Sequence, residues 1–304
     1  MGIPSCKSVD ARRRVEPRGA DDLRQTQAGL CQGGCRWAVA SLIACFGSAV
    51  DAEQFRIATY AAPLSRDGPG LLLRNILRGE DPQITAVQGI IGAVDPDVIV
   101  LTDFDYDLDG MALAAFVELT GYPFQFAALP NAGMPTGLDI DGNKRLGEAR
   151  DAQGYGRFSG DGGMAILSKM RIQTDAVVDL SATLWRDVDG AILPSVDGTP
   201  FPSEAAQAVQ RISSASHWIA PIAPQDTPPF SLLAWSATPP VFDGPEDCNG
   251  LRKRDELRMW ANLLDTDPPS SFVIAGNANL DPVDGGGLRD AMATFLACDD
   301  VIDP

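Results

Sequence analysis

The amino-acid sequence predicts a mixed-sheet α/β sandwich, and three properties of the chain lead to this fold class. The chain has 304 residues, of which 45% are hydrophobic, so it can bury a sizeable core. Its 30 glycines and 23 prolines, with many short apolar runs, indicate frequent turns and strands rather than long helices. Strand-like and helix-like segments alternate without the strict strand–helix–strand rhythm of a doubly wound sheet.

Apolar runs and helical spacing locate the expected elements. Short apolar runs beside turn-forming residues predict strands, and apolar residues at helical spacing predict helices. In chain order, the expected elements are strand 55–60, helix 84–94, strand 98–101, helix 111–120, strands 163–168 and 231–236, helix 251–264, strand 272–275 and helix 288–296. The fifth strand is followed directly by Gly276, which starts a turn.

Polar side chains gather where expected strands end. Asp103 and Asp105 follow the second strand, and Asn277 and Asn279 follow the fifth. Loops at strand ends are where rigid scaffolds place their chemistry. Asp and Asn are also ordinary turn residues, so each group taken alone indicates only a turn.

The chain carries a formal net charge of −17. Such a surface repels the phosphate backbone of nucleic acids unless metal ions or a local basic groove intervene. The sequence has no cluster of Lys and Arg with interleaved aromatic residues. The charge therefore indicates a well-solvated surface more than any particular partner.

An N-terminal segment has the parts of a secretory signal peptide. Arg36 precedes an apolar stretch at 37–47, and the small residues Val50 and Ala52 follow where a cleavage site requires them. The stretch is too short to span a bilayer comfortably. We therefore expect cleavage after Ala52 and a secreted or periplasmic protein. A buried helix is the alternative.

The same segment also fits a bacterial lipoprotein processing box at 42–45, which would anchor the protein through Cys45. Residues before 36 show no clear hydrophobic period, and we expect them to be disordered or to precede the true start site. The expected organisation is an extension and signal peptide at 1–52, followed by one domain at 53–304.

Six cysteines are present, and cleavage after Ala52 would leave Cys248 and Cys298. One disulfide between them is possible in an oxidising compartment, but their spacing does not establish it. Cys31 and Cys35 lack a second pair with metal-ligand spacing, so we do not expect a zinc site.

Five segments resemble, in this order, the successive motifs of secreted bacterial proteins of the endonuclease/exonuclease/phosphatase (DNase-I-like) superfamily. They are PDVIVLTDFDYD (96–107), GRFSGDGGMAILSK (156–169), SSASHW (213–218), TPPVFDGPEDCNGLRKRDELRMWANLL (238–264) and FVIAGNANLDPVDG (272–285). The fourth is the most specific. The resemblance covers roughly residues 53–304. It implies a four-layer sandwich of two mixed or antiparallel sheets flanked by helices.

The resemblance also assigns positions that would carry metal-dependent phosphoester hydrolysis. Asp103 stands where the family has a Glu and is the expected metal ligand, although it is shorter by one methylene, about 1.5 Å of reach. Ala61 and Ala237 stand where the family has an Asn and a His. The family's final Asp-His pair has no counterpart before Pro304.

Three further residues are the expected catalytic candidates. Asn279 matches the Asn of the family's G-D-x-N turn, whereas Asn277 replaces its Asp with an amide that cannot take a proton near neutral pH. His217 is the only histidine, which rules out a two-histidine metal site. As part of the SHW motif it is a candidate acid or phosphate contact. The alternative is a structural histidine beside Trp218.

The acidic segment at 243–256 has several interpretations. Asp243 and Asp255 are candidate substrate-binding residues, and metal binding is another possible role of the segment. We favour a third interpretation, in which the segment orders its loop and Asp255 or Glu256 forms a salt bridge on the helix. A second acidic run at 139–143 faintly resembles a calcium loop. Its sixth and twelfth positions are Lys144 and Arg150 instead of Gly and Glu, so we discount it.

Family members continue past the helix that follows the G-D-x-N turn, with strands that complete a sheet. On this resemblance the last strands are missing from the chain. We therefore expect an unpaired sheet edge and a groove of apolar residues beside it. A partner that adds strands at that edge is one expectation, since exposed edges accept extended chains.

The expected function follows from these substitutions. The resemblance implies a phosphoester hydrolase that uses Mg²⁺ or another divalent ion on a small phosphoester or a nucleic acid. General acid–base groups contribute roughly 10²–10⁴-fold each, so losing several predicts weak or no activity, as in a pseudoenzyme. The alternatives are a non-catalytic secreted module that binds a phosphorylated ligand or a protein, and a nonfunctional gene fragment.

Overall fold

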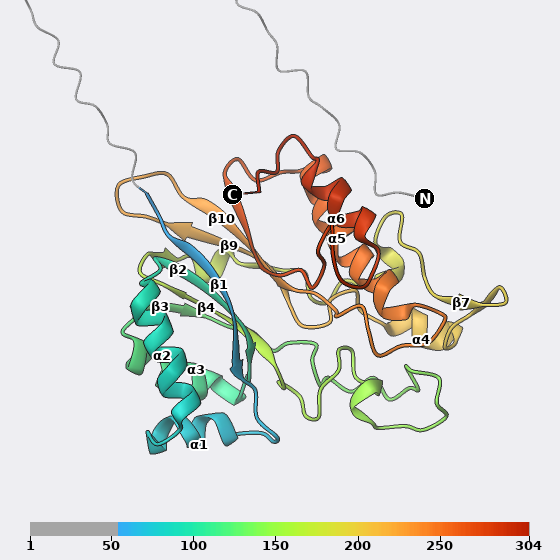
Figure 1. The fold of residues 1–304 in the computed structure, drawn as a ribbon, viewed down its shortest axis with the longest axis horizontal. Coiled ribbons are helices and arrows are strands. Elements are labelled where there is room, and N and C mark those ends of the chain that lie inside the picture. Colours follow the sequence, from blue (N-terminus) through green and yellow to red (C-terminus); the bar gives the residue numbers. More distant parts are fainter. Residues whose placement is uncertain (1–53, 304) are drawn as a thin grey trace, which may run out of the picture. The chain divides into compact units, whose positions relative to one another are not determined.

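The structure is a computed structural model, and it describes residues 54–303 (Figure 1). Its main elements are, in chain order, β1 (Ile57–Leu64), α1 (Leu71–Arg78), α2 (Pro82–Val94), β2 (Val98–Phe104), α3 (Met111–Thr120), β3 (Phe124–Phe126), β4 (Gly163–Ser168), β5 (Arg171–Ile172), β6 (Val178–Asp179), β7 (Ser195–Val196), β8 (Thr199–Pro200), α4 (Glu204–Val209), β9 (His217–Ala223), β10 (Phe230–Ser236), α5 (Cys248–Thr266), β11 (Phe272–Asn277) and α6 (Arg289–Leu296).

The strands form two mixed sheets and one small hairpin. The first sheet has the order β1-β2-β4-β3, with β1 parallel to β2 and the other pairs antiparallel. The second has the order β11-β10-β9-β5, with β6 also paired to β9, and only β11 and β10 run parallel. Strands β7 and β8 form the hairpin. The predicted mixed-sheet architecture is confirmed.

The two sheets pack face to face, and helices cover their outer faces (Figure 1). Val98 and Val100 of β2 share one buried cluster with Leu232 and Ala234 of β10, which lies between the sheets. Helices α1, α2 and α3 pack on the outer face of the first sheet. Helices α5 and α6 cover the outer face of the second. The result is the expected four-layer sandwich.

Every predicted element is present, with boundaries that shift by a few residues. Helix α1 is not among the elements expected from the sequence. This helix is only 8 residues long, buries Leu72 and Ile76 alone, and lies between Gly70 and Gly79, whose φ values of 72° and 66° are left-handed. Such a short helix with two buried contacts leaves little periodic signal, and its flanking glycines favour a loop when taken by themselves.

Strands β1 and β11 are outer strands of their sheets among residues 54–303. Every open sheet has such strands, so the missing last strands and the apolar groove expected from the resemblance stay predictions. Every residue of β11 is partly exposed. The two outer strands touch where the amide of Gly276 donates a 2.9 Å hydrogen bond to the Oγ1 of Thr59.

The predicted signal peptide and lipoprotein box at 1–52 lie outside the described residues. Within residues 54–303, no helix is both long enough and apolar enough to cross a membrane. Cys248 is a free thiol, so the disulfide considered between Cys248 and Cys298 is not formed.

Candidate functional site

Asp103 lies in a bulge near the end of β2, where the register with both β1 and β4 shifts. Its φ of 64° is left-handed, a conformation that Asp adopts more readily than most other residues with a side chain. The side chain is exposed, and among residues 54–303 its carboxylate takes part in no hydrogen bond or ion pair. The bulge thus presents an unengaged carboxylate at the strand end.

The surroundings of Asp103 raise the pKa of its carboxyl to about 6. The main cause is partial burial of the carboxyl group, whose Oδ1 lies against Gly162, and the negative charge of Asp161 adds to it. Arg157 and Arg66 act in the opposite direction. Because the charged form is disfavoured, a cation placed beside Asp103 would be favourable.

Asp105 is buried and fully engaged. Its carboxylate accepts hydrogen bonds from the amides of Arg66, at 2.8 Å, and Gly162, at 3.0 Å. Burial raises the pKa of Asp105 to about 6, against the effect of these two hydrogen bonds. The residue therefore holds the loops beside β2 in place, while Asp103 faces outward.

Asp161, which was not among the candidate residues expected from the sequence, completes the carboxylate group. It accepts hydrogen bonds from Ser65 Oγ at 3.0 Å, and from the amide and Nε of Arg157 at 2.8 and 3.0 Å. Burial alone would raise the pKa of Asp161, but these bonds, above all that from Arg157, hold it below its usual value. The signal in the sequence was an Asp within the glycine-rich run before β4.

These residues fit one kind of metal site. Mg²⁺ keeps several water molecules and is usually held by one or two carboxylates, so a single unengaged carboxylate is a sufficient protein ligand. Asp103 supplies one, whereas the oxygens of Asp105 and Asp161 already bind backbone and side-chain donors. The geometry therefore fits a largely hydrated divalent ion beside Asp103, and it does not fit an ion enclosed by several carboxylates.

Asn277 and Asn279 tie the ends of β10 and β11 together. The Oδ1 of Asn277 accepts a 2.9 Å bond from the amide of Asn279, whose Nδ2 donates a 2.6 Å bond to the carbonyl of Ala237. Gly276 is required before them, because a Cβ at that position would lie 1.9 Å from the carbonyl oxygen of Trp235. Both asparagines thus have turn-stabilising contacts, and among residues 54–303 no hydrogen bond joins them to Asp103.

The alanines at predicted site positions lie beside these groups. Ala61 is opposite Thr102 in the β1–β2 ladder, so a methyl group stands one residue from Asp103. Ala237 is buried, and its amide donates a 2.8 Å bond to the carbonyl of Asn277. Neither position offers a ligand or a proton donor.

His217 is fully buried. Its Nδ1 lies 2.8 Å from the Oγ of Ser213, and its ring lies 5.4 Å from that of Trp235 and 5.3 Å from that of Trp260. Burial, with a smaller contribution from the charge of Arg252, lowers the pKa of the imidazole to about 3. The ring is a neutral core group in this conformation, and it contacts neither solvent nor the other candidate residues.

Asp255, a predicted substrate-binding residue, is also fully buried. It accepts hydrogen bonds from the indole Nε1 of Trp185 at 2.7 Å and the amide of Ile192 at 2.8 Å, and it pairs with Arg254 at 2.5 Å. These contacts fasten the loop before α4 to helix α5. They correspond to the loop-order interpretation, and they leave Asp255 out of reach of a substrate.

A cavity of about 730 Å³ opens beside Thr238, the residue after Ala237. Loop residues from 140–155, three residues between 201 and 214, and the 238–252 segment line it. Asp243 is the predicted site residue on its wall, where its Oδ2 accepts a 2.6 Å bond from the amide of Asn249.

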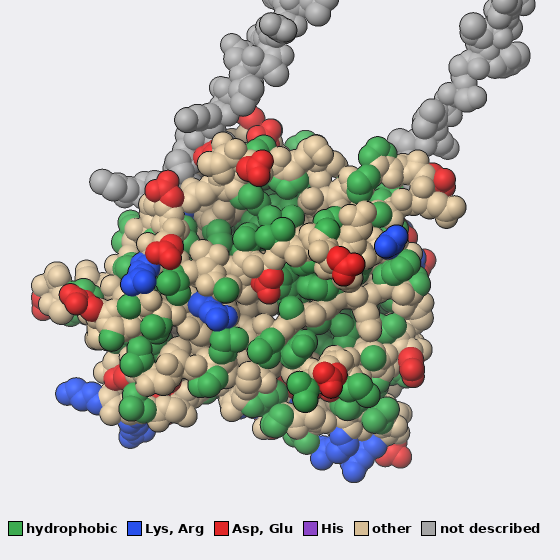
Figure 2. All heavy atoms as spheres, turned by 180° about the vertical axis from the view of Figure 1, so that it is seen from behind, with side chains coloured by type: hydrophobic (Ala, Val, Ile, Leu, Met, Phe, Trp, Pro, Cys, Tyr) green, Lys and Arg blue, Asp and Glu red, His purple; other side chains and the backbone are tan. Residues whose placement is uncertain are grey.

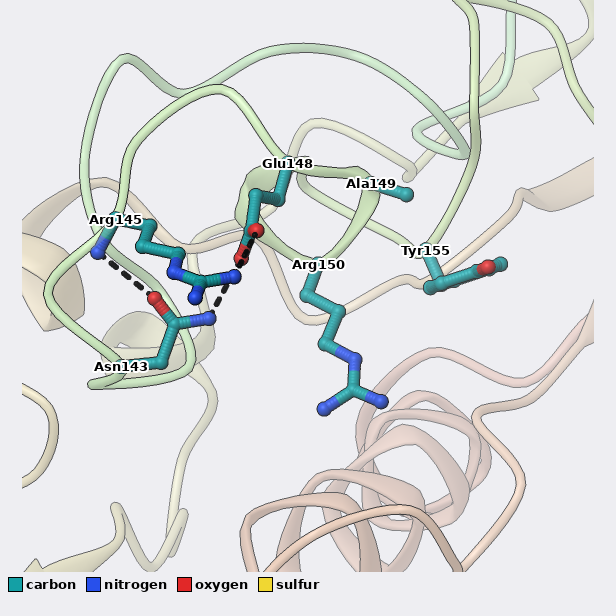
Figure 3. Close-up of a pocket in the computed structure, with 6 residues that line it drawn as sticks. All are labelled: Asn143, Arg145, Glu148, Ala149, Arg150 and Tyr155. Atoms are coloured by element: carbon teal, nitrogen blue, oxygen red, sulfur yellow. Dashed lines mark hydrogen bonds and ion pairs between the residues drawn. The ribbon is translucent and has the colours of Figure 1, made fainter.

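A second, shallower cavity of about 370 Å³ lies on the same loop (Figure 3). Asn143 accepts a 2.8 Å bond from the amide of Arg145 and donates a 2.6 Å bond to Glu148. Arg150 points away from these three residues toward α5 (Figure 3). Arg150 and Tyr155 line both cavities.

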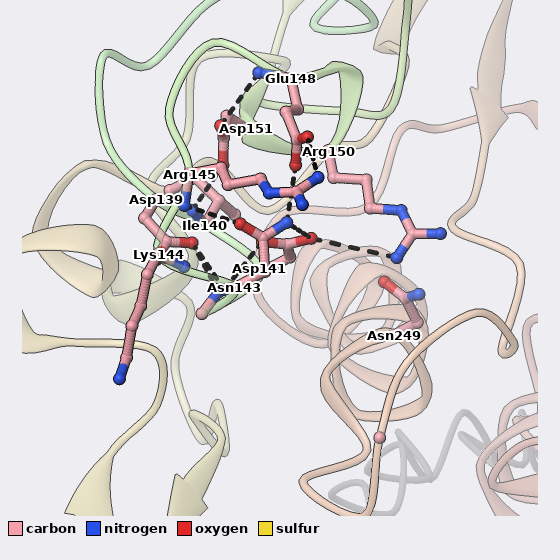
Figure 4. A network of polar contacts seen from close by, with 12 residues as sticks. Asp139, Ile140, Asp141, Asn143, Lys144, Arg145, Glu148, Arg150, Asp151 and Asn249 are labelled. Atoms are coloured by element: carbon pink, nitrogen blue, oxygen red, sulfur yellow. Dashed lines mark hydrogen bonds and ion pairs between the residues drawn. The ribbon is translucent and has the colours of Figure 1, made fainter.

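Three carboxylates of this loop gather closely (Figure 4): those of Asp139, Asp141 and Asp151 have oxygens within 4.8 Å of one another. The calcium loop was discounted on sequence grounds, and the structure explains the cluster by loop contacts. Asp139 accepts three backbone amides, Asp151 accepts two, and Asp141 lies 3.9 Å from the guanidinium of Arg150.

The fold and its strand-end polar groups define a four-layer α/β sandwich of the DNase-I-like class. The family model "Endonuclease/Exonuclease/phosphatase family" matches residues 74–303, so the chain belongs to that family. No curated protein matches the chain.

Solved structures similar to the chain are distant. One is an endonuclease/exonuclease/phosphatase from Beutenbergia cavernae, with 15% identity, a TM-score of 0.47, and coverage of 80% of this chain and 53% of that one. Another is sphingomyelinase C from Streptomyces griseocarneus, with 15% identity, a TM-score of 0.44, and coverage of 80% and 68%. A magnesium-bound beta toxin from Staphylococcus aureus has 11% identity, a TM-score of 0.45, and coverage of 81% and 72%. The chain thus spans about half the length of the first.

Proposed function

We propose that the chain is a phosphoesterase-type protein that retains a divalent-cation site at Asp103 but hydrolyses phosphoesters weakly or not at all. One observation supports this most: Asp103 keeps an unengaged carboxylate, whereas positions 61 and 237 are alanines. A bound cation would polarise a phosphoryl oxygen of the substrate. The positions where the family has groups that transfer protons carry other residues in this chain.

The side chains available for proton transfer are few. Asn277 and Asn279 are amides and cannot act as bases near neutral pH. The only imidazole of the chain, that of His217, is buried and neutral. Asp103 itself would be occupied by the cation. We therefore expect binding of a metal and a phosphoester without efficient attack by water.

The expected substrate class is a small phosphoester rather than a nucleic acid. The net charge of −17 disfavours a polyanion, and Figure 2 shows acidic side chains scattered over one face without a continuous basic stripe. A small ester needs only the local cation site, because its charge is borne by one group.

Hydrolysis assays test the catalytic part. Purified protein with Mg²⁺ is incubated with DNA and with bis(p-nitrophenyl) phosphate, and we expect rates far below one turnover per second, an ordinary enzyme rate. Turnover near that rate, abolished in Asp103→Asn, would show instead that catalysis survives.

Calorimetric titration with Mg²⁺ tests the metal part. Asp103→Asn removes the charge, and Asn tolerates the left-handed backbone. Asp109→Asn is the matched control, because Asp109 is likewise exposed and has a φ of 63°. We expect Asp103→Asn to abolish saturable Mg²⁺ binding and Asp109→Asn to retain it. Equal binding by both variants would rule out Asp103 as the ligand.

We also propose that the protein is exported, on the strength of the signal-peptide pattern that ends at Ala52. Mass spectrometry of the mature N-terminus in the native host tests this. A chain that begins after Ala52 agrees with a secreted or periplasmic protein, and a lipid-modified Cys45 with an anchored one. An intact Met1 would exclude both.

A further inference from the structure

Some of the polar side chains that line the cavity of about 730 Å³ have donors or acceptors without a partner among residues 54–303. Three buried polar residues line this cavity: Gln210 is 6% exposed, Thr238 5% and Arg252 6%. Buried polar groups normally have hydrogen-bond partners, and each exception calls for an explanation. Thr238 Oγ1 and the side-chain amide of Gln210 are such exceptions among residues 54–303, and they lie with Arg252, whose Nη1 is unused there, on one cavity; together they indicate a site built for a ligand.

Arg252 carries the positive charge of this site. Its Nε and Nη2 donate to the carbonyls of Ile212, Gln153, Arg211 and Ser213, at 2.6–2.9 Å. Among residues 54–303 its Nη1 has no hydrogen bond, and no carboxylate lies within ion-pair distance. The nearest charge compensation comes from Glu256, whose oxygens are taken by Ser214 and Thr238.

Thr238 and Gln210 add donors beside that charge. The Oγ1 of Thr238 is buried and has no hydrogen-bond partner among the described residues. The side-chain amide of Gln210 has none there either, in contrast to Gln207, which donates to the carbonyls of Pro194 and Phe201. A guanidinium, a hydroxyl and an amide at one cavity match the oxygens of a carboxylate or a phosphoryl group.

Two exposed aromatic residues line the same cavity. Tyr155 is 67% exposed and Phe242 is 79% exposed. Phe242 also has a φ of 72°, which is a genuine outlier for a bulky residue and costs of order 1–3 kcal/mol. A strained backbone that holds an aromatic ring in solvent needs a reason, and contact with the body of a ligand supplies one.

The remaining charged residues of the wall limit the ligand. Asp243 and Glu246 are negatively charged, and Asp141 lies beside Arg150 on the opposite side. Arg150 points toward Asn249 of α5 (Figure 4). These acidic groups repel a second negative charge, so the ligand carries one anionic group and an otherwise uncharged body.

We propose that this cavity binds a small organic anion, with its carboxylate or phosphoryl group at Arg252, Gln210 and Thr238 and its apolar or aromatic body against Tyr155 and Phe242. The volume suits such a molecule, since ligand pockets span roughly 300–1,000 Å³. Asp103 does not line this cavity, so we expect the anion to bind without a metal at Asp103.

The first probe is phenylphosphonate, which has a non-hydrolysable C–P bond, titrated into the full chain by calorimetry in EDTA. Methylphosphonate tests the role of the ring, and benzoate tests a carboxylate in place of the phosphoryl group. We expect saturable 1:1 binding of at least one aromatic anion, and weaker binding of methylphosphonate. Absence of saturable binding by both aromatic anions would overturn the proposal.

Thr238→Val locates the site without removing a bond that the fold uses, whereas loss of Arg252 would remove four hydrogen bonds to backbone carbonyls. Thr102→Val is the matched control, since Thr102 is also buried with an unpartnered Oγ1 but does not line the cavity. We expect Thr238→Val to weaken binding about tenfold, or 1.4 kcal/mol, and Thr102→Val to leave the affinity unchanged. Equal affinities in the two variants would refute the assignment.

A last variant separates this site from the proposed metal site. Asp103→Asn should bind the aromatic anion as the wild type does, and Gln210→Leu should bind it more weakly. If Asp103→Asn lost the anion, the ligand would belong to the strand-end site and the cavity proposal would fail. The metal proposal would then still stand on the Mg²⁺ titration.

Discussion

The backbone amide of Thr238 donates a 2.7 Å hydrogen bond to Oε2 of Glu256, which ties the loop after β10 to helix α5. Ser214 uses both its amide and its hydroxyl for the other oxygen, at 3.0 and 3.2 Å. One fully buried carboxylate therefore holds two of the segments that border the large cavity.

Removing that carboxylate should weaken the fold. Glu256→Ala leaves the Thr238 amide and both Ser214 donors buried without a partner, so we expect a loss of about 3 kcal/mol in the free energy of unfolding. Glu118→Ala, on the exposed face of α3, should change it by less than about 0.5 kcal/mol. Urea denaturation measures both, and equal midpoints would contradict the assigned role.

The titration of Glu256 should make stability depend on pH. Burial raises the pKa of this carboxyl from 4.5 to about 6, so the folded state holds its proton more tightly than the unfolded chain. The stabilisation that protonated Glu256 adds to the free energy of unfolding is complete below pH 4.5. As the pH rises through 6, this stabilisation of about 2 kcal/mol is lost. Glu256→Gln should lack this loss. Parallel stability curves for wild type and Glu256→Gln between pH 4 and pH 7 would exclude it.

The elements that could be predicted from sequence are those whose apolar pattern is long or bounded by clear turns. Strand β4 and helix α3 have the predicted boundaries, because each apolar run stops at polar or glycine residues. Strand β9 was not predicted as an element. Its polar start at His217 and its Pro221 resemble a loop, and its burial comes from pairing with β10.

The candidate site was predictable only where a side chain stands next to a strand end. Asp103 was found in this way. The bonds that engage Asp161 join it to Ser65, 96 residues earlier, and no local pattern contains such a contact. In the same way, the sequence places Arg252 in an exposed-looking charged run, and only the packing of α5 against residues 211–213 shows that it is buried.

Mg²⁺ binding at Asp103 should weaken in acid. The carboxyl must lose its proton to bind the ion, and its pKa of about 6 places that step within a convenient range. At pH 5 the fraction of deprotonated Asp103 is lower than at pH 8 by about tenfold, and the apparent affinity should fall by the same factor. An affinity that is independent of pH over this range would mean that another group holds the ion.

His217 should limit stability at low pH. Because burial lowers the pKa of its imidazole from 6.5 to about 3, the unfolded chain binds the proton first. The stability contributed by the neutral ring is therefore complete above pH 6.5 and is lost as the pH falls toward 3. In His217→Phe this acid loss should be smaller, and any Mg²⁺ binding should be unchanged. Urea midpoints at several pH values measure the difference, and coincident slopes would argue against a buried neutral imidazole.

Phe242 should respond to mutation in opposite directions for stability and binding. Phe242→Gly relieves the left-handed strain at φ 72°, so we expect the free energy of unfolding to rise by about 1 kcal/mol. The same change removes a ring from the cavity and should weaken binding of phenylphosphonate. Lys144→Gly is the control: its φ is 68° and it does not line that cavity, so it should stabilise the fold and leave binding intact. Because general loosening of the protein would lower stability and binding together, only an aromatic contact with the ligand gives the opposite signs expected for Phe242→Gly.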